Sequence, residues 1–168
     1  MFGSRKSKQQ SPRELYDGLR GQALAIEPAA DEFHPSAALP NVWGALLETG
    51  YGPEVATLLC LSDGTTSLYT TSGFVIIGGG GHEQVVSATR AFLGAVEAAL
   101  DAFIPETAAA LPGDGETIMH ALTFTGLRAI HAPELDLGEG RHPQSAVFHA
   151  GQAVITELRL LSEAHEAR

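Results

Sequence analysis

Lysine is nearly absent from this sequence. Lys6 and Lys8 are its two lysines, and both lie with Arg5 close to the start of the chain. Residues 11–168 carry seven arginines against 20 acidic residues, a formal charge of −13. Such a chain has no basic face that could replace the counterions of a phosphate backbone, so we expect no nucleic-acid binding. Residues 1–10 are expected to form a disordered basic tail, with contact to an acidic partner or a membrane surface as the alternative.

Cysteine and long apolar runs are also scarce. The single cysteine, Cys60, cannot form a disulfide within the chain. It lies in a predicted strand without a basic neighbour to lower its thiol pKa, so we expect a buried structural cysteine. No apolar run reaches the roughly 18 to 20 residues that span a bilayer, and no apolar segment follows the basic N-terminus. These absences predict a cytoplasmic protein with no transmembrane segment and no signal peptide.

The short motifs of common enzyme classes are missing as well. There is no Gly-x-Ser-x-Gly elbow, and the glycine-rich segment at 78–81 lacks the lysine and the Ser or Thr of a P-loop. His82 and Glu83 open a predicted helix, but Val86 stands where a zincin has its second histidine. We therefore assign no catalytic residue and expect no cofactor.

What is present is typical of one globular domain. Hydrophobic residues make up 44% of the 168-residue chain and charged residues 18%, which is a globular composition rather than a disordered one. A domain of this size buries roughly two thirds of its extended-chain surface. The sequence has no internal repeat, so we expect residues 11–168 to form a single domain.

Residues 55–103 contain the clearest structural signals. The short apolar segment at 56–62 is predicted to be a strand. An Asp-Gly pair follows at 63–64, and it favours a tight hairpin because both central positions of a type I′ turn need positive φ. Residues 65–77 are rich in β-branched and hydroxyl side chains and are predicted to return as the next strand.

From Val85 the apolar period changes to that of a helix. The helix is predicted to end before Pro105, because the residue that precedes a proline is restricted away from helical geometry. Its apolar stripe consists of Val85, Thr89, Phe92, Val96, Leu100 and Phe103.

The N-terminal part predicts one helix and one further strand. A helix is expected over residues 11–26, because it starts with the capping-box sequence Ser-Pro-Arg-Glu with proline at the first helical position. Residues 27–41 contain three prolines and predict an irregular connection. Residues 42–49 fit either a short helix or a strand. We prefer the strand, which gives a three-stranded meander from 42 to 77.

The C-terminal part predicts a linker, two strands and a helix. Residues 104–115 have no periodicity and are expected to be a linker, whereas 117–124 and 127–132 form a strand pair. Residues 133–142 are expected to form an acidic loop. In the last helix, which follows Pro143, a mid-helix glycine costs about 1 kcal/mol relative to alanine. Its stripe is Val147, Gly151, Val154, Leu158 and Leu161, and we expect Gly151 to allow a close approach to the sheet.

Taken together, the predicted order is helix, three strands, helix, two strands, helix. This order favours an α+β fold, a mostly antiparallel sheet of about five strands with three helices packed on it. The layout is loosely similar to that of the small sensor and scaffold folds of the profilin, roadblock and GAF type. Fold alone does not give a function.

The strand-to-helix junction at Gly78, Gly79, Gly80 and Gly81 is a candidate ligand site. Bare backbone amides before a helix N-terminus can bind an anion. His82 and Arg128 are included as candidate ligand-binding residues. The alternative is a junction in which small residues let chain segments pack closely.

A second candidate is a divalent metal site in the acidic segment after the last strand. His131, Asp136, Glu139 and His142 combine imidazole and carboxylate groups, although their spacing matches no standard site. The alternative is a solvated acidic loop in which Arg141 supplies the counter-charge. His120 and His149 are expected to be packed or surface histidines.

These observations favour a non-enzymatic protein-interaction or scaffold module, which we expect to be a homodimer or part of a larger assembly, with a second copy of itself or another protein as the partner. Trp43, Tyr69 and Phe74 lie on or beside predicted strands and are the candidate interface residues. The alternative is a small-ligand or anion sensor that uses the glycine junction. The third possibility is a metal-assisted hydrolase that uses the acidic segment.

Overall fold

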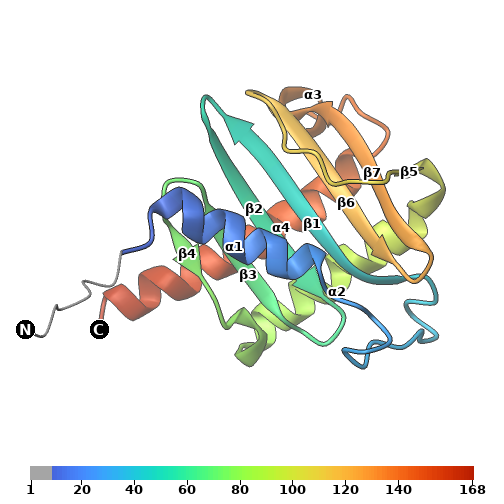
Figure 1. The fold of residues 1–168 in the computed structure, drawn as a ribbon, viewed down its shortest axis with the longest axis horizontal. Coiled ribbons are helices and arrows are strands. Elements are labelled where there is room, and N and C mark those ends of the chain that lie inside the picture. The colour runs from blue at the N-terminus through green and yellow to red at the C-terminus, as the bar shows by residue number, and fades with distance from the viewer. Residues whose placement is uncertain (1–8) are drawn as a thin grey trace, which may run out of the picture.

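The computed structural model describes residues 9–168, which form an α+β fold around one antiparallel sheet. The strand order is β4-β3-β2-β1-β6-β7-β5 (Figure 1). The predicted α+β class is confirmed, but the sheet has seven strands rather than about five. Most of the basic tail expected at 1–10 lies outside the described residues.

The helices are α1 (Pro12–Leu24), α2 (Glu83–Ala98), α3 (Glu134–Gly138) and α4 (Ser145–Glu166). The strands are β1 (Val42–Tyr51), β2 (Glu54–Leu61), β3 (Thr66–Thr70), β4 (Val75–Ile76), β5 (Ile104–Pro105), β6 (Glu116–Thr123) and β7 (Gly126–Pro133). Two short 3-10 turns, at Gly79–Gly81 and Leu100–Ala102, flank α2. No helix within residues 9–168 combines the length and the apolarity that crossing a membrane requires.

The first half of the sheet is a meander of four strands rather than three. The segment that fitted both a helix and a strand is the strand β1, and it pairs with β2 along its length. Residues 74–77 were expected to continue the preceding strand. Instead Gly73 adopts a φ of 100°, and the chain reverses there to form β4 against β3.

Two short elements of the second half were not predicted. β5 pairs with β7 through only two residues, at the edge opposite β4, inside the segment expected to be a linker. Part of the expected acidic loop folds as α3, because Leu137 is fully buried and fixes this turn against the core. Neither element is long enough to show a periodicity in the sequence.

Helices cover the two faces of the sheet unequally. α2 and α4 lie behind it in the view of Figure 1, and α1 crosses the front. The segment between β5 and β6 also passes over the front face. Each face has its own apolar core: Phe92, Val96 and Val154 belong to the rear core, and Trp43 and Leu46 to the front one.

Gly151 makes the close approach that its position predicted. A Cβ atom there would lie 2.7 Å from Cδ2 of Leu47 in β1 and 3.1 Å from Cε2 of Phe92 in α2. Because both neighbours are buried core side chains, only glycine lets α4 sit this close to the sheet.

Gly50, near the end of β1, is a position where we expect a substitution to be costly. A Cβ atom there would clash with the backbone of Gly113, 2.6 Å from its carbonyl carbon. The carbonyl of Gly50 also accepts the N–H of Gly115 at 2.9 Å, which fastens the β5–β6 segment to the sheet. Gly50→Ala should therefore destabilise the fold by about 2–3 kcal/mol.

The matched control is Gly94→Ala in α2, where a Cβ atom would meet nothing within 4 Å. Replacing a helical glycine by alanine at an open position should stabilise by about 0.5–1 kcal/mol. Urea unfolding of both variants measures the two changes. Equal changes in the free energy of unfolding for the two variants would contradict the close packing of Gly50 against Gly113.

Candidate functional site

The register of the strands aligns one row of side chains across the front face of the sheet. Tyr69 of β3 pairs with Thr57 of β2, and Thr57 pairs with Glu48 of β1. Glu48 in turn pairs with Ile118 of β6, and Ile118 with His131 of β7. Antiparallel partners share a face, so a carboxylate and two hydroxyls come together under α1.

Glu48 is at the centre of this row and is fully buried. Arg20 of α1 donates to both carboxylate oxygens at 2.8 Å, from Nε and from Nη2. Thr57 Oγ1 donates to Oε2 at 2.7 Å, and the Nε2–H of His120 donates to Oε1 at 2.9 Å. The Tyr16 hydroxyl lies 2.7 Å from Thr57 Oγ1 and 3.4 Å from Oε2. We name these five residues the Glu48 cluster.

The cluster keeps Glu48 ionised. Burial alone would raise the pKa of this carboxyl, but the hydrogen bonds and charges of Arg20 and His120 outweigh burial and lower its pKa to about 2. Burial, together with the charge of Glu48, raises the pKa of Tyr16 to about 12. Both groups therefore hold their ordinary charge at neutral pH, and neither is poised to exchange a proton there.

Arg20 extends the cluster to the segment that crosses the front face. Its Nη2 also donates to the carbonyl oxygens of Ala109 and Ala110, at 3.2 and 3.3 Å. One guanidinium thus joins α1, the centre of the sheet and the β5–β6 segment. Since this side chain is largely buried, its hydrogen bonds are shielded from competing water.

Three buried polar atoms near this region have no hydrogen-bond partner among the described residues: Trp43 Nε1, Tyr69 Oη and His120 Nδ1. Buried polar groups are nearly always paired, so each of these atoms calls for a water or a ligand atom. Burial also raises the pKa of Tyr69, so its hydroxyl stays protonated.

Beside the cluster, the front face is hollowed into a groove of about 470 Å³, which we call the front groove. Its floor is formed by Trp43 and by residues of the β6–β7 hairpin, including Leu122 and Leu127. The end of α1, with Leu24, forms one wall, and residues 107–109 of the β5–β6 segment form another. The groove therefore lies next to the two carbonyls that Arg20 holds.

The glycine junction has the features of close packing. A Cβ atom at Gly79 would lie 2.6 Å from Leu158 Cδ2, and one at Gly80 would lie 2.7 Å from the carbonyl oxygen of Gly64. Gly78 adopts a φ of 87°, which favours glycine. These contacts and the positive φ account for glycine at positions 78–80 without a ligand, as the close-packing alternative predicts, whereas Gly81 has neither a close neighbour nor a positive φ.

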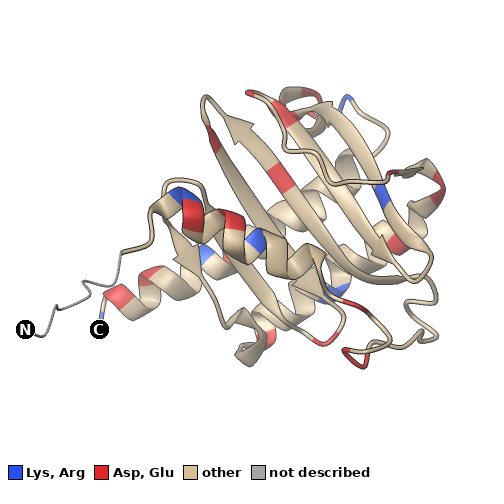
Figure 2. Ribbon diagram, in the orientation of Figure 1, with Lys and Arg blue, Asp and Glu red and all other residues tan. Residues whose placement is uncertain are grey.

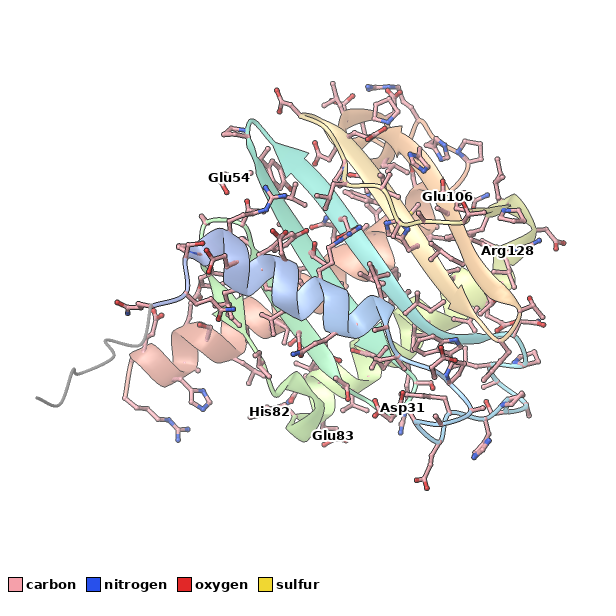
Figure 3. The ribbon with its side chains drawn as sticks, in the orientation of Figure 1. Asp31, Glu54, His82, Glu83, Glu106 and Arg128 are labelled. Atoms are coloured by element: carbon pink, nitrogen blue, oxygen red, sulfur yellow. The ribbon has the colours of Figure 1, made fainter. Side chains whose placement is uncertain are left out.

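The other two residues predicted for this ligand site lie apart. His82 follows the glycine junction and faces His165 of α4, with ring centroids 6.2 Å apart. Arg128 lies on β7, far from His82 in Figure 3, and donates to the carbonyl of Leu100 at 3.3 Å. The structure therefore places Gly78, Gly79 and His82 along one cavity of about 260 Å³, whereas Arg128 lies apart from it.

The residues proposed for a metal site each have other partners. Arg141 pairs with Asp136 and with Glu139, as expected for a solvated acidic segment with its own counter-charge. His131 Nε2 lies 2.5 Å from Glu106 Oε1, and His142 Nδ1 accepts the backbone N–H of the residue two positions on, Gln144. Within residues 9–168 no group of three or more potential ligands is placed to hold a metal ion.

The predicted interface residues divide into two kinds. Trp43 and Tyr69 are buried in the front core, so neither can form a surface contact while α1 is in place. The assignment was wrong for these two, because the face expected to be open is covered by α1. Phe74, directly before β4, is 46% exposed and is available for contact with another chain. Cys60 is buried as expected, and burial raises the pKa of its thiol to about 12.

Sequence reasoning missed the Glu48 cluster. The available signal was a glutamate inside an otherwise apolar strand, since Glu48 falls where β1 should continue inward-facing apolar residues. An isolated carboxylate in such a strand needs a cation and hydrogen bonds. Figure 2 shows how little charge the strands otherwise carry.

Comparison with protein-family models, with curated proteins and with solved structures finds no match to this chain.

Proposed function

We propose that this protein is a non-enzymatic interaction module that pairs with a second copy of itself through the β4 edge of its sheet. The proposal rests on one observation, an apolar and largely open edge strand. Residues 74–77 read Phe-Val-Ile-Ile, and Phe74 and Ile77 are 46% and 65% exposed. β4 pairs with β3 on one side, and its other side is the end of the sheet.

An edge of this kind is costly to leave open. Sheet edges are ordinarily protected by charge, proline or a covering segment, because their free backbone groups pair readily with another chain. The tetrapeptide at β4 contains neither a charge nor a proline. The opposite edge differs, since β5 contains Pro105 and is followed directly by Glu106. One edge is therefore protected and the other is suited to pairing.

A two-fold pairing of β4 with itself satisfies this edge. Two antiparallel edges related by a two-fold axis present the same surface to each other, so that Phe74 and Ile77 of each copy are covered together. A cavity of about 260 Å³ beside β4 is lined by Ile77 and His82 and by Leu161 and His165 of α4. This cavity provides room for a side chain of the second copy.

The Glu48 cluster supports a non-enzymatic function for this protein. Its carboxylate and imidazole resemble a catalytic pair, yet Glu48 accepts hydrogen bonds from four side chains and is fully buried. General acid–base catalysis needs a group with a pKa near the working pH that reaches the substrate. A sealed carboxylate with a lowered pKa fits a structural role.

The test is the mass of the protein in solution as a function of concentration. The wild-type chain should behave as a dimer, and Ile77→Lys should shift the equilibrium toward monomer by at least tenfold in dissociation constant. The lysine is readily solvated in the monomer, because position 77 is exposed, but it would be desolvated in the interface. Light scattering after size exclusion gives the mass directly.

Ile104→Lys is the matched control. Ile104 belongs to β5 at the opposite edge and is 69% exposed, so the same substitution is made on an edge that the proposal leaves free. This variant should remain a dimer. A wild-type chain that is monomeric at high concentration, or equal effects of the two lysines, would contradict pairing through β4.

A further inference from the structure

We propose that the front groove is a binding site for a small apolar molecule with a neutral or cationic polar end. This site lies on the α1 face, away from the β4 edge, and it does not depend on self-association. Its volume of about 470 Å³ falls in the range of small-ligand sites, which are mostly apolar with few polar groups.

The lining is apolar and incompletely covered by the protein itself. Leu24 and Ile26 from the end of α1, and Phe124 and Leu127 from the β6–β7 hairpin, all line the groove and are only partly buried. Apolar groups that converge on a hollow gain about 25 cal/mol per Å² when an apolar ligand removes water from them. The lining therefore favours an alkyl chain or a ring over a polar molecule.

Trp43 lines this groove and carries an indole N–H that is unpaired within residues 9–168. The residue is 5% exposed and lines the groove, and its Nε1 has no acceptor among the residues that the structure describes. An unpaired buried indole N–H is expected where a water or a ligand atom completes the hydrogen bond. A hydroxyl oxygen of the ligand can accept this N–H, whereas an ammonium end leaves the N–H to a water.

The charge at the rim selects the ligand's polar end. Glu27, which follows α1, is the charged residue of the lining, and it is exposed. Asp31 is close by, because its carboxylate accepts the backbone N–H of Glu27 at 3.0 Å, and Figure 3 shows it in the loop beyond α1. The carboxylate of Glu27 in the lining, with that of Asp31 close by, attracts a cation and repels an anion. An amine or a hydroxyl group therefore suits the rim, whereas a carboxylate does not.

The outer wall of the groove is held in place before any ligand binds. Nη2 of Arg20 donates to the carbonyls of Ala109 and Ala110 as well as to Glu48 Oε1, and Nε donates to Glu48 Oε2. A wall fixed in this way loses little conformational entropy on binding, which favours affinity. Arg20 thus positions the groove, and the Glu48 cluster acquires a role in ligand binding without touching the ligand.

The sole tryptophan of the chain is Trp43, so its fluorescence reports on the groove directly. The full-length protein is titrated with N-phenyl-1-naphthylamine, an uncharged aromatic probe. We expect saturable quenching of Trp43 emission. The bound probe is then displaced with decanol, decylamine or decanoate, each below its micellar concentration. Decylamine and decanol should displace the probe at concentrations at least tenfold below that of decanoate.

Ala108→Phe is the variant that tests the place of binding. Ala108 is exposed and lines the groove, so a phenyl ring there fills the hollow without disturbing the core. Affinity for the probe should fall at least tenfold. Ala164→Phe, at an exposed position near the end of α4, is the control and should change the affinity less than twofold. Melting temperatures of both variants check that each one folds.

Each part of the proposal has a result that would overturn it. Absence of saturable quenching, or equal affinity in Ala108→Phe and Ala164→Phe, would overturn the groove as a binding site. Displacement by decanoate as effective as by decylamine would overturn the assignment of a neutral or cationic end. Repeating the titration with Ile77→Lys distinguishes the two proposals, because a monomeric variant that keeps its affinity shows that the groove acts independently of the β4 edge.

Discussion

Replacing Glu48 with alanine should destabilise the protein by about 3–5 kcal/mol, the largest effect that we expect of a single substitution. Removing one partner of a buried ion pair leaves the other charge without compensation. Here the guanidinium of Arg20 would lose both of its carboxylate bonds, and Thr57 and His120 would each lose an acceptor. A net stability of 5–15 kcal/mol is typical of a domain, so this variant should be close to unfolding.

Urea unfolding followed by the fluorescence of Trp43 measures this change, since that residue is buried in the same core. The control is Glu106→Ala. Glu106 is also paired with a histidine, His131, but the two side chains are 22% and 39% exposed. Exposed ion pairs contribute about 0–1 kcal/mol, so the control should lose no more than that. If Glu48→Ala lost as little as Glu106→Ala, the cluster would not be sealed from water.

Local patterns were sufficient to predict most of the elements. The capping Ser11 accepts the backbone N–H of Glu14 at 3.1 Å, as the capping-box sequence implies. The stripe of the second helix is buried at Val85, Phe92 and Val96. These signals lie within a few residues of the structure that they specify. β4 and β5 have only two residues each, so no alternation could mark them.

The Glu48 cluster could not be predicted in this way, because its members are far apart in the sequence. Arg20 and Glu48 are separated by 28 positions, and Glu48 and His120 by 72. These residues come together only because β6 pairs with β1 in the sheet and because α1 packs across the front of the sheet. The wrong assignment of Trp43 and Tyr69 to an open face has the same cause.

The cluster, the β5–β6 segment and the front groove form one structural unit. Gly115 bonds to Gly50 at one end of the segment, and Arg20 bonds to Ala109 and Ala110 nearer its middle. A change that loosens Arg20 should therefore act on two properties together, the stability of α1 on the sheet and the shape of the groove. Within the Glu48 cluster, acid removes the charge of Glu48, to which Arg20 is bonded.

The second large effect that we expect is a loss of stability in acid. The pKa of Glu48 lies at about 2 in the folded protein, below its ordinary value of 4.5. A lowered folded-state pKa contributes stability that is fully present above the unfolded value and is lost as the pH falls toward the folded value. The window is therefore from about pH 5 down to about pH 2, and a shift of this size corresponds to about 3 kcal/mol.

Glu48→Gln isolates this contribution from those of the other carboxyl groups. Glutamine keeps the shape of the side chain but cannot ionise, so its stability has no linkage to the proton at this position. The difference in unfolding free energy between the wild-type protein and Glu48→Gln should be largest above pH 5 and should shrink as the pH is lowered to 3. A difference that stays constant across this range would mean that the pKa of Glu48 is not lowered in the folded protein. The hydrogen bonds of Arg20 and His120 to its two oxygens predict that it is lowered.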